Sequence, residues 1–523
     1  MRLELDMELI GRGAAVFAFI MLTIVGAIFS FYLIFSINQA YMYPIAISFL
    51  ILTIISGFFN VFTSYSYYRS YLYNSYLERI QKGLKPLTKY PTVAIAMPIY
   101  NEDVAVVEQN LLQLKKMDYP QEKLTFYLLD DSTDAKKRKE LLNFCKSNGI
   151  RYMHREKRSG FKAGALNNML KRLDSEFLAI FDYDEYLTNN NFLRELLPYF
   201  DDNELSYVQT EKRYVKGNFF SDTIDLFDAL FFKFIQPARA LNNTAIFAGS
   251  CGIIRSSYLK KLGGFPEYII EDTFFSFESG LKGYKSLYVP KVYALGKPVQ
   301  TFSELAKQQW RYNYGDTQFL FYLLRKLRGN SKSKKNMSTL SRIDYMTHGF
   351  GLNYISTIML IFTIVSILIV FSQVSLLNVS LSSIIQGKNI NFGLEILGIL
   401  AFLFSILTPI ILTKLYFKSI KKGLMIFVLN FSLVFIRTRA AIAAAFNLKR
   451  TSNKLWASTN ISRVRYQKVA FALRNSLYEV FFSALLLSLS YVALGVDNFV
   501  GGVWLLWYGL LYISTLFLFY KYG

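Results

Sequence analysis

The chain has 523 residues, of which 53% are hydrophobic and only 18% are charged, whereas soluble domains usually carry about a quarter of charged residues. This composition excludes a disordered chain and argues against a wholly soluble enzyme, and the two cysteines and two histidines are too few and too scattered for a disulfide scaffold or a zinc site. The formal net charge of +22 leaves two interpretations, a nucleic-acid-binding protein or a membrane protein with basic cytoplasmic loops.

Apolar runs of membrane-spanning length lie near both ends of the chain. A bilayer span needs about 20 mostly apolar residues in a row. Runs with at most one acidic residue cover residues 14–37, 41–63, 350–373, 392–413, 476–495 and 498–520. The sequence therefore predicts an α-helical membrane domain of about six spans, split by a long polar middle.

Lysine and arginine residues gather beside these runs, in residues 64–90 and 324–349 and on both sides of residues 423–446. By the positive-inside rule, both termini and the central segment then lie in the cytoplasm of a multi-pass plasma-membrane protein. Since the basic residues border membrane segments, we expect contacts with membrane lipids and no nucleic-acid partner.

Residues 423–446 are long and apolar enough to span a bilayer but contain Arg437 and Arg439. An arginine at mid-bilayer costs about 2.5–3.5 kcal/mol on insertion scales, and one span cannot have both flanks in the cytoplasm. We therefore expect an interfacial or re-entrant helix here, with a transmembrane passage as the open alternative.

The central segment, residues 91–320, alternates short apolar runs with amphipathic ones. The strands expected from this pattern cover residues 92–97, 124–130, 150–154 and 177–182, and the helices cover 104–117, 135–147 and 162–173. This order predicts a mostly parallel sheet covered by helices, whose ligands bind beyond the carboxyl ends of the strands. Neither a GxGxxG fingerprint nor a Walker-type phosphate loop is present in the sequence.

Asp182 and Asp184 form a D-x-D pair directly after an expected strand. Carboxylates two residues apart in an extended chain point the same way and offer the oxygen ligands that Mg²⁺ or Mn²⁺ prefers. Such a cation would bridge a diphosphate and stabilise it as a leaving group. The pair alone is also compatible with a solvated acidic turn.

Further polar segments follow the other expected strands and open the expected helices. They are PIYNED (98–103), DDSTD (130–134), KAGALNN (162–168), AGSCGIIR (248–255), IIEDTF (269–274) and QQWRYNYG (308–315). Their order and spacing resemble the family 2 glycosyltransferases with a GT-A (Rossmann-like) fold, and more narrowly the membrane-embedded cellulose, chitin and hyaluronan synthases. One departure is Tyr312, which stands where the family's Q-x-x-R-W motif has tryptophan.

The resemblance implies an activity, a cofactor and partners. Members transfer a sugar, with inversion and with Mg²⁺ or Mn²⁺, from a UDP- or GDP-linked donor to a growing β-linked polysaccharide that crosses the membrane through the enzyme's own spans. Two alternatives remain open: transfer of one sugar to a lipid-phosphate carrier or glycolipid, and a transporter or channel with a cytoplasmic regulatory domain.

The resemblance also implies roles for single residues. Nucleotide-sugar-binding residues would be Tyr100, Glu102, Asp130, Asp131, Lys162, Asp182, Gln308 and Arg311. The metal would lie on Asp182 and Asp184, and Asp272, beside Glu271, would be the general base that takes the proton of the acceptor hydroxyl. Asp272 is also a suitable N-cap for a helix that begins at Thr273.

Two further groups of residues concern the acceptor. The acceptor would contact Gly249, Ser250, Cys251, Trp310 and Tyr312. Cys251 is equally explained as a small packing residue, and the two aromatic residues as interfacial anchors. A gating loop would contain Trp456, Thr459 and Arg463, although a plain basic loop explains that segment as well.

These inferences divide the chain into successive parts. They are an N-terminal helix pair (1–63), a basic linker (64–90), the catalytic domain (91–320), a basic or interfacial segment (321–349), a second helix pair (350–413), the interfacial helix with the gating loop (414–474) and a final helix pair (475–523).

Overall fold

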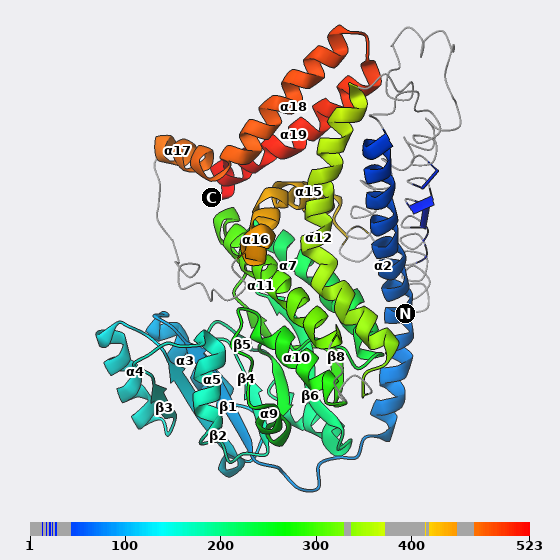
Figure 1. Ribbon diagram of the computed structural model, residues 1–523. Coiled ribbons are helices and arrows are strands. Elements are labelled where there is room, and N and C mark those ends of the chain that lie inside the picture. Colours follow the sequence, from blue (N-terminus) through cyan, green and yellow to red (C-terminus); the bar gives the residue numbers. More distant parts are fainter. Residues whose placement is uncertain are drawn as a thin grey trace.

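The computed structural model describes residues 43–328, 336–371, 418–446 and 465–523, together with residue 414 and single positions between residues 13 and 28. Within these residues, a sheet with apolar clusters on both faces forms the central domain, and long helices from both ends of the chain gather at one end of it (Figure 1). This arrangement confirms the α/β fold class expected for the middle of the chain.

The described residues contain one eight-stranded sheet with the strand order β3-β2-β1-β4-β7-β6-β8-β5. Its strands are β1 (Val93–Ile99), β2 (Leu124–Asp130), β3 (Arg151–His154), β4 (Phe177–Ile180), β5 (Tyr186–Leu187), β6 (Leu205–Tyr214), β7 (Gly252–Arg255) and β8 (Lys285–Gly296). The half formed by β3, β2, β1 and β4 is parallel, as expected. The next strand, whose direction the sequence did not predict, runs the other way: β7 is antiparallel to β4 and β6, because it starts from a loop at the carboxyl end of β4.

Helices connect and cover the strands. In the central domain they are α3 (Val104–Leu114), α4 (Ala135–Ser147), α5 (Phe161–Leu170), α6 (Phe192–Leu196), α7 (Phe219–Leu230), α8 (Gln236–Ala240), α9 (Ser256–Leu262) and α10 (Glu271–Leu281). At the membrane end they are α2 (Tyr43–Gly83), α11 (Phe302–Arg328), α12 (Thr339–Val370), α15 (Ile420–Ser432), α16 (Val434–Phe446), α17 (Arg465–Asn475), α18 (Leu477–Gly495) and α19 (Phe499–Tyr522).

Strand β1 shows why the sequence of the parallel half is apolar without alternation. Val93, Ile95 and Met97 pack into the core on one face of the sheet, and Ala94 and Ala96 pack into the core on the other. Both faces are therefore buried, as in other parallel sheets. The small alanine side chains face the cluster that contains α5 and leave room for that helix to lie close to the strand.

Several predicted elements match the structure closely. Strand 124–130 and helix 135–147 have the predicted ends. Strand β1 continues past the predicted end at residue 97 and includes Pro98. Proline is tolerated there because β4 pairs with β1 only over Val93–Ala96, so this edge of β1 needs no donor beyond that point.

Helix α2 runs for 41 residues through the boundary expected between the second span and the basic linker. Its lower half is fixed to the catalytic domain: Tyr73 is fully buried and donates a hydrogen bond to the backbone oxygen of Tyr288 in β8, and Leu77 packs beside it. The segment after residue 63 is therefore helical and packed down to Gly83, rather than a free linker.

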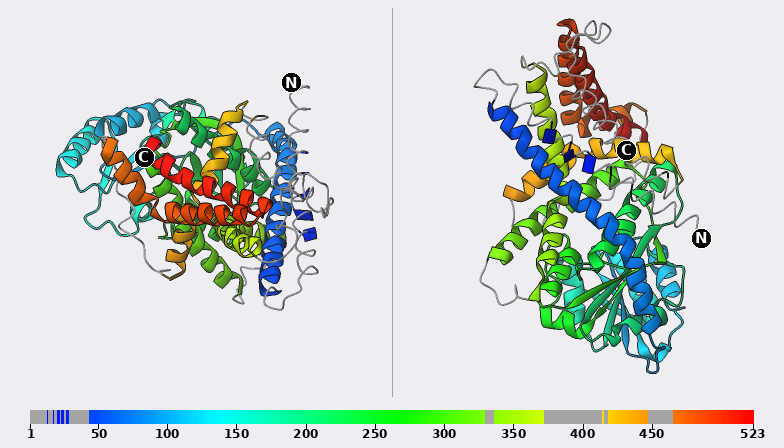
Figure 2. Two further views of the ribbon diagram at one scale, coloured as in Figure 1. Left: turned by 90° about the horizontal axis from the view of Figure 1, so that it is seen from above. Right: turned by 90° about the vertical axis from the view of Figure 1, so that its right-hand side faces the viewer.

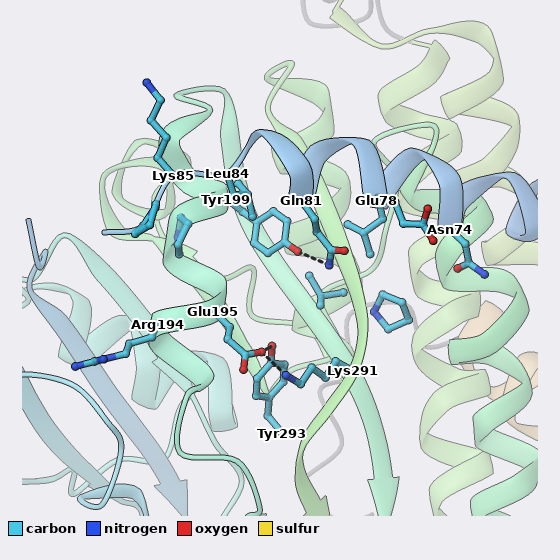
Figure 3. Close-up of a pocket in the computed structure, with 15 residues that line it drawn as sticks. Asn74, Glu78, Gln81, Leu84, Lys85, Arg194, Glu195, Tyr199, Lys291 and Tyr293 are labelled. Carbon is cyan, nitrogen blue, oxygen red and sulfur yellow. Dashed lines mark hydrogen bonds and ion pairs between the residues drawn. The ribbon is translucent and has the colours of Figure 1, made fainter. Parts of the chain in front are cut away.

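A cavity of about 660 Å³ lies between the last turns of α2, the segment 194–199 and the middle of β8 (Figure 3). Its polar groups largely bind one another: Gln81 donates to the Tyr199 hydroxyl, and Glu195 pairs with Lys291 and Tyr293. None of the residues that line it belongs to the acidic segments predicted to bind the donor.

The helices at the membrane end test part of the predicted topology. Among the described residues, α18 and α19 are long and apolar enough to cross a bilayer, and they pack side by side (Figure 2). Helices α15 and α16 meet at a bend of 41° and would add a third passage only if the pair is one span. Most of run 14–37 and all of run 392–413 lie outside the described residues, so the six spans stay a prediction.

A buried ion pair joins α12 to the catalytic domain. Arg239 in α8 lies 3.3 Å from Asp344 in α12, and the two side chains are 2% and 3% exposed. Asp344 also accepts hydrogen bonds from Thr244 and Asn242, and Arg239 donates to the backbone oxygen of Thr244 at 2.9 Å. The two buried charges are thus paired with each other, although Arg239 Nη2 has no hydrogen-bond partner among the described residues.

We predict that Asp344→Ala lowers the free energy of unfolding by about 3–5 kcal/mol, because Arg239 is left buried without its partner. The thermal midpoint in detergent measures this. The matched control is Asp202→Ala, which breaks an exposed pair with Lys285 and should cost less than about 1 kcal/mol. Equal shifts in the two variants would contradict the prediction.

Candidate active site

The acidic segments meet at one edge of the sheet. β2 and β4 flank β1 on opposite sides and are parallel to it, so the carboxyl ends of all three strands lie together where the winding reverses. Ligands of open α/β sheets bind in the crevice at such a point. The loops 100–103, 131–134 and 181–185 start there.

Asn101 fastens the first two of these loops to each other. Its backbone N–H donates to Ser132 Oγ at 2.7 Å, and its side-chain oxygen accepts from the N–H groups of Thr133 and Asp134 at 2.9 and 3.1 Å. The residue has φ of 57°, which asparagine tolerates better than most residues. The sequence motif contained Asn101, but the prediction assigned it no role.

The residues predicted to hold the nucleoside fall into two groups. The Arg158 guanidinium lies 3.4 Å from the ring centre of Tyr100, and Asp131 is paired with Arg155 through both oxygens. Asp130 lies below them, fully buried, and accepts hydrogen bonds from the Ser132 N–H and the Tyr152 hydroxyl. Tyr100 and Asp131 thus border the crevice, whereas Asp130 supports it from inside.

Glu102 belongs to the same crevice. Burial raises the pKa of its carboxyl, although a hydrogen bond with Tyr183 opposes the shift. Tyr183 stands inside the D-x-D motif, so this contact links the loop after β1 to the loop after β4.

Asp182 is the centre of the site. Lys162, in the first turn of α5, donates to Asp182 Oδ1 at 2.6 Å, and Ser250 donates to Oδ2 at 2.9 Å. Lys212 lies 3.5 Å from the same Oδ2. Burial alone would raise the pKa of Asp182, but the two lysines outweigh it and hold that pKa below its ordinary value.

Lys212 and Glu185 were not predicted. Lys212 Nζ lies 3.0 Å from Glu185 Oε1 and 2.5 Å from Ser250 Oγ, while Glu185 Oε2 accepts from the backbone N–H of Asp182 at 2.8 Å. Lys212 lies near the carboxyl end of β6, and the acidic residues likewise lie near the carboxyl ends of their own strands. The sequence signal by which Lys212 could have been predicted as a site residue is a charged side chain at the end of a strand.

Asp184, the second carboxylate of the motif, is buried close to other carboxylates. Burial, followed by the neighbouring charges of Asp182 and Glu185, raises its pKa to about 7. Among the described residues, no three or more His, Cys, Asp or Glu side chains form a metal cluster of their own. Two carboxylates still fit Mg²⁺ or Mn²⁺, because such ions are commonly held by one or two carboxylates together with substrate phosphates.

The loop before β7 brings the predicted base to this cluster. Gly249 has φ of 81°, and a Cβ placed on it would lie 3.1 Å from Asp272 Oδ2 and 3.5 Å from Lys162 Nζ. Glycine therefore lets the loop pass directly over these two groups. Asp272, Lys162 and Asp182, which are far apart in the sequence, meet around this loop.

Asp272 is not a helix cap. Helix α10 begins at Glu271 and its N-cap is Ile270, so Asp272 lies within the first turn, where its Oδ1 accepts from the Thr273 N–H at 2.8 Å. The alternative of an N-cap before Thr273 is therefore wrong, since the helix starts earlier. Burial raises the pKa of Asp272, and burial together with Asp272 raises the pKa of Glu271.

Gln209 in β6 holds the 248–251 loop in place. Its side-chain oxygen accepts from the Ala248 N–H at 2.7 Å, and its nitrogen donates to the backbone oxygens of Ser250 and Cys251 at 3.0 and 3.3 Å. Cys251 itself is buried with φ of 52°, and burial raises the pKa of its thiol well above the ordinary value. It packs in the core, in agreement with the packing alternative.

Helix α11 completes the site. Gln308 donates to the Tyr312 hydroxyl at 3.2 Å, and the charge of Arg311 opposes the raised pKa of both Glu271 and Asp272, which places Arg311 near them. Trp310 instead faces Arg439 of α16, whose guanidinium lies 5.7 Å from its ring centre. The predicted gating residues Trp456, Thr459 and Arg463 lie outside the described residues.

Residues 94–263 match the family described as glycosyl transferase family 2. This match agrees with the resemblance that the motifs predicted, and it contains the strands and acidic segments that border the crevice up to residue 263.

The chain resembles cellulose synthases in this region. It is 31% identical over 238 residues to a cellulose synthase catalytic subunit of Pseudomonas fluorescens, over 44% of this chain and 32% of that protein. It is 28% identical over 282 residues to a probable glucomannan 4-beta-mannosyltransferase 7 of Oryza sativa subsp. japonica, over 50% and 46%. The chain therefore spans about a third of the length of the first of these relatives.

Among solved structures, the mannosyltransferase PcManGT from Pyrobaculum calidifontis, in complex with GDP-Man and Mn²⁺, is 16% identical and has a TM-score of 0.48. The superposition covers 73% of this chain and 96% of that chain.

We predict that Gln209→Leu loosens the 248–251 loop, because each buried backbone group left without its partner costs about 1–3 kcal/mol. Hydrogen exchange should accelerate in peptides that contain these residues, and the thermal midpoint should fall. Gln113→Leu is the control, since it removes one hydrogen bond to the backbone oxygen of Leu187 at a half-exposed site. Unchanged exchange in the Gln209 variant would refute the scaffold role.

Proposed function

We propose that this protein transfers sugar units from a nucleotide diphosphate sugar to a growing β-linked polysaccharide at the cytoplasmic face of the plasma membrane. The observation that carries the proposal is the meeting of Asp272, Lys162 and Asp182 beneath the glycine of the 248–251 loop. A base, a cation and a carboxylate gathered around one loop are what transfer from a diphosphate donor needs.

On the donor side, Tyr100 carries Arg158 over one face of its ring and would offer the other face to the nucleoside base, and Glu102 and Asp131 border the same space. Lys162 lies at the N-terminal turn of α5, where anions are favoured, and its ammonium faces the place of the diphosphate. Mg²⁺ or Mn²⁺ held by Asp182 and Asp184 would neutralise charge on the leaving diphosphate.

On the acceptor side, Asp272 takes the proton of the attacking hydroxyl. The oxygen then bonds to the anomeric carbon while the bond from that carbon to the diphosphate oxygen breaks, and the diphosphate leaves with the electron pair. One in-line displacement inverts the configuration and needs no nucleophile from the protein. The raised pKa of Asp272 makes it a stronger base than an exposed aspartate.

The membrane helices support a product that leaves through the membrane. Helix α11 lies against the start of α10 at Gly315 and contacts α16 and α19 with other residues. We therefore infer that the acceptor end of the site, with Trp310 and Tyr312, lies toward the membrane domain, and this position supports translocation of the product through the spans.

We predict that Asp272→Asn lowers kcat by about 100- to 10,000-fold, because the amide cannot accept the proton of the acceptor hydroxyl. Binding of the nucleotide should change little, since Asp272 faces the acceptor. Nucleotide release and equilibrium binding of UDP or GDP measure the two effects. Asp202→Asn is the matched surface control. Turnover near the wild-type level in Asp272→Asn would refute the base assignment.

We predict a polymeric, metal-dependent product. Purified protein in lipid vesicles, screened with UDP- and GDP-linked sugars, should release nucleotide and form glycan chains. EDTA should lower the rate by at least about tenfold, and Mg²⁺ or Mn²⁺ should restore it. A monosaccharide-lipid as the sole product would support single-sugar transfer instead, and activity unaffected by EDTA would contradict the metal assignment.

A further inference from the structure

Arg437 and Arg439, the charged residues that argued against a span over 423–446, are directed toward the catalytic domain. Helix α16, which carries both, packs against α11 and α12 (Figure 1). Arg437 is buried, with a relative exposure of 2%, so its charge must be met by protein groups.

The groups that meet Arg437 come from α11 and α15. Arg437 Nε and Nη2 donate to the side-chain oxygen of Gln309 at 3.0 and 2.8 Å, and Nη1 lies 3.4 Å from Asn430 Oδ1. Gln309 is equally buried. The guanidinium fork thus joins both halves of the bent pair α15–α16 to one residue of α11.

Gln309 is next to the residues of α11 that face the site. Gln308, Arg311 and Tyr312 belong to the same turn and the turn that follows. Further along, a Cβ on Gly315 would lie 2.7 Å from Ile270, the residue before Glu271, so α11 lies tightly against the start of α10. Because Gln309 and Arg311 are two residues apart in one helix, a contact that holds Gln309 also restrains the position of Arg311 relative to α10.

Arg439 makes a second set of contacts between α16 and other helices. Its guanidinium lies between two rings, 5.7 Å from Trp310 of α11 and 4.4 Å from Tyr478 of α18. Helix α16 therefore contacts the catalytic helix and the first of the final apolar helices at the same time.

We propose that Arg437 is a positioning residue for sugar transfer: by clamping Gln309 it holds α11, and with it Arg311 and Tyr312, at the distance from Asp272 that the reaction requires. The inference rests on the proposed function. The clamp also explains how an arginine is accommodated in an apolar segment, because its hydrogen bonds are made to protein and not to lipid.

A purely electrostatic role is the competing explanation. Asp316 of α11 is buried, and burial raises its pKa well above the ordinary value, whereas the nearby charge of Arg437 opposes that rise. If Arg437 served only to balance Asp316, lysine would replace it without loss. If it clamps Gln309, lysine fails, because one ammonium cannot reproduce the fork.

The test compares Arg437→Lys with Lys421→Gln, an exposed residue of the same bent pair. We expect Arg437→Lys to lower kcat by about tenfold while the donor KM and the thermal midpoint stay unchanged, because misplacement affects the reacting geometry more than binding. Adding Gln309→Glu to Arg437→Lys should restore part of kcat through a direct ammonium–carboxylate contact. Lys421→Gln should match the wild type.

Two results would overturn the proposal: full activity of Arg437→Lys, or a loss of activity that follows a fall in thermal midpoint. An activity-independent readout separates this failure from failure of the proposed function. With Trp456, Trp504 and Trp507 replaced by phenylalanine, Trp310 is the remaining tryptophan. Arg437→Lys should increase its quenching by acrylamide; unchanged quenching refutes the clamp even if the wild type transfers no sugar.

Discussion

Two lysine ammonium groups keep a set of carboxylates together at the sheet edge, and the rest of the site depends on that balance. Asp182, Asp184 and Glu185 lie close together in a poorly solvated crevice, where like charges repel far more than in water. Lys162 reaches them from the parallel half of the sheet and Lys212 from the mixed half. The two halves of the domain therefore meet in one electrostatic contact, which fixes Asp182 in its ionised form and leaves Asp184 with a raised pKa.

This arrangement of ammonium and carboxylate groups suits a charged ligand, such as a diphosphate together with a divalent cation. A diphosphate would compete with Asp182 for the same ammonium groups, and a divalent cation would relieve the crowding that raises the pKa of Asp184. The resting ion pairs thus hold the binding groups in place before the donor arrives. Gly249 contributes in another way: any side chain there would fill the space next to Asp272 and Lys162.

The sequence predicted the elements whose signal is local. Strand 124–130 and helix 135–147 were correct because a buried parallel strand and an Asp-capped helix each have a signature within one short segment. Antiparallel β7, Lys212 and Gln209 were missed, because their importance comes from contacts with residues about 30 to 80 positions away that no short motif encodes. The N-cap reading of Asp272 failed for a related reason: helix α10 starts earlier than its sequence suggests, at Glu271, which is itself buried beside the site.

Arg437 and Arg439 show that a charged residue in an otherwise apolar segment can indicate a contact with a distant part of the chain. Their cost in lipid argued against a simple span, but only the fold supplies Gln309 and Trp310 as their partners. Since α11 is packed against the start of α10 on one side and clamped by α16 on the other, a shift of the bent pair changes the catalytic geometry unless the clamp opens. Under the proposed function, addition of a sugar and movement of the product past the membrane helices would then be linked mechanically through α11, and a substitution of Gln309 would break that link.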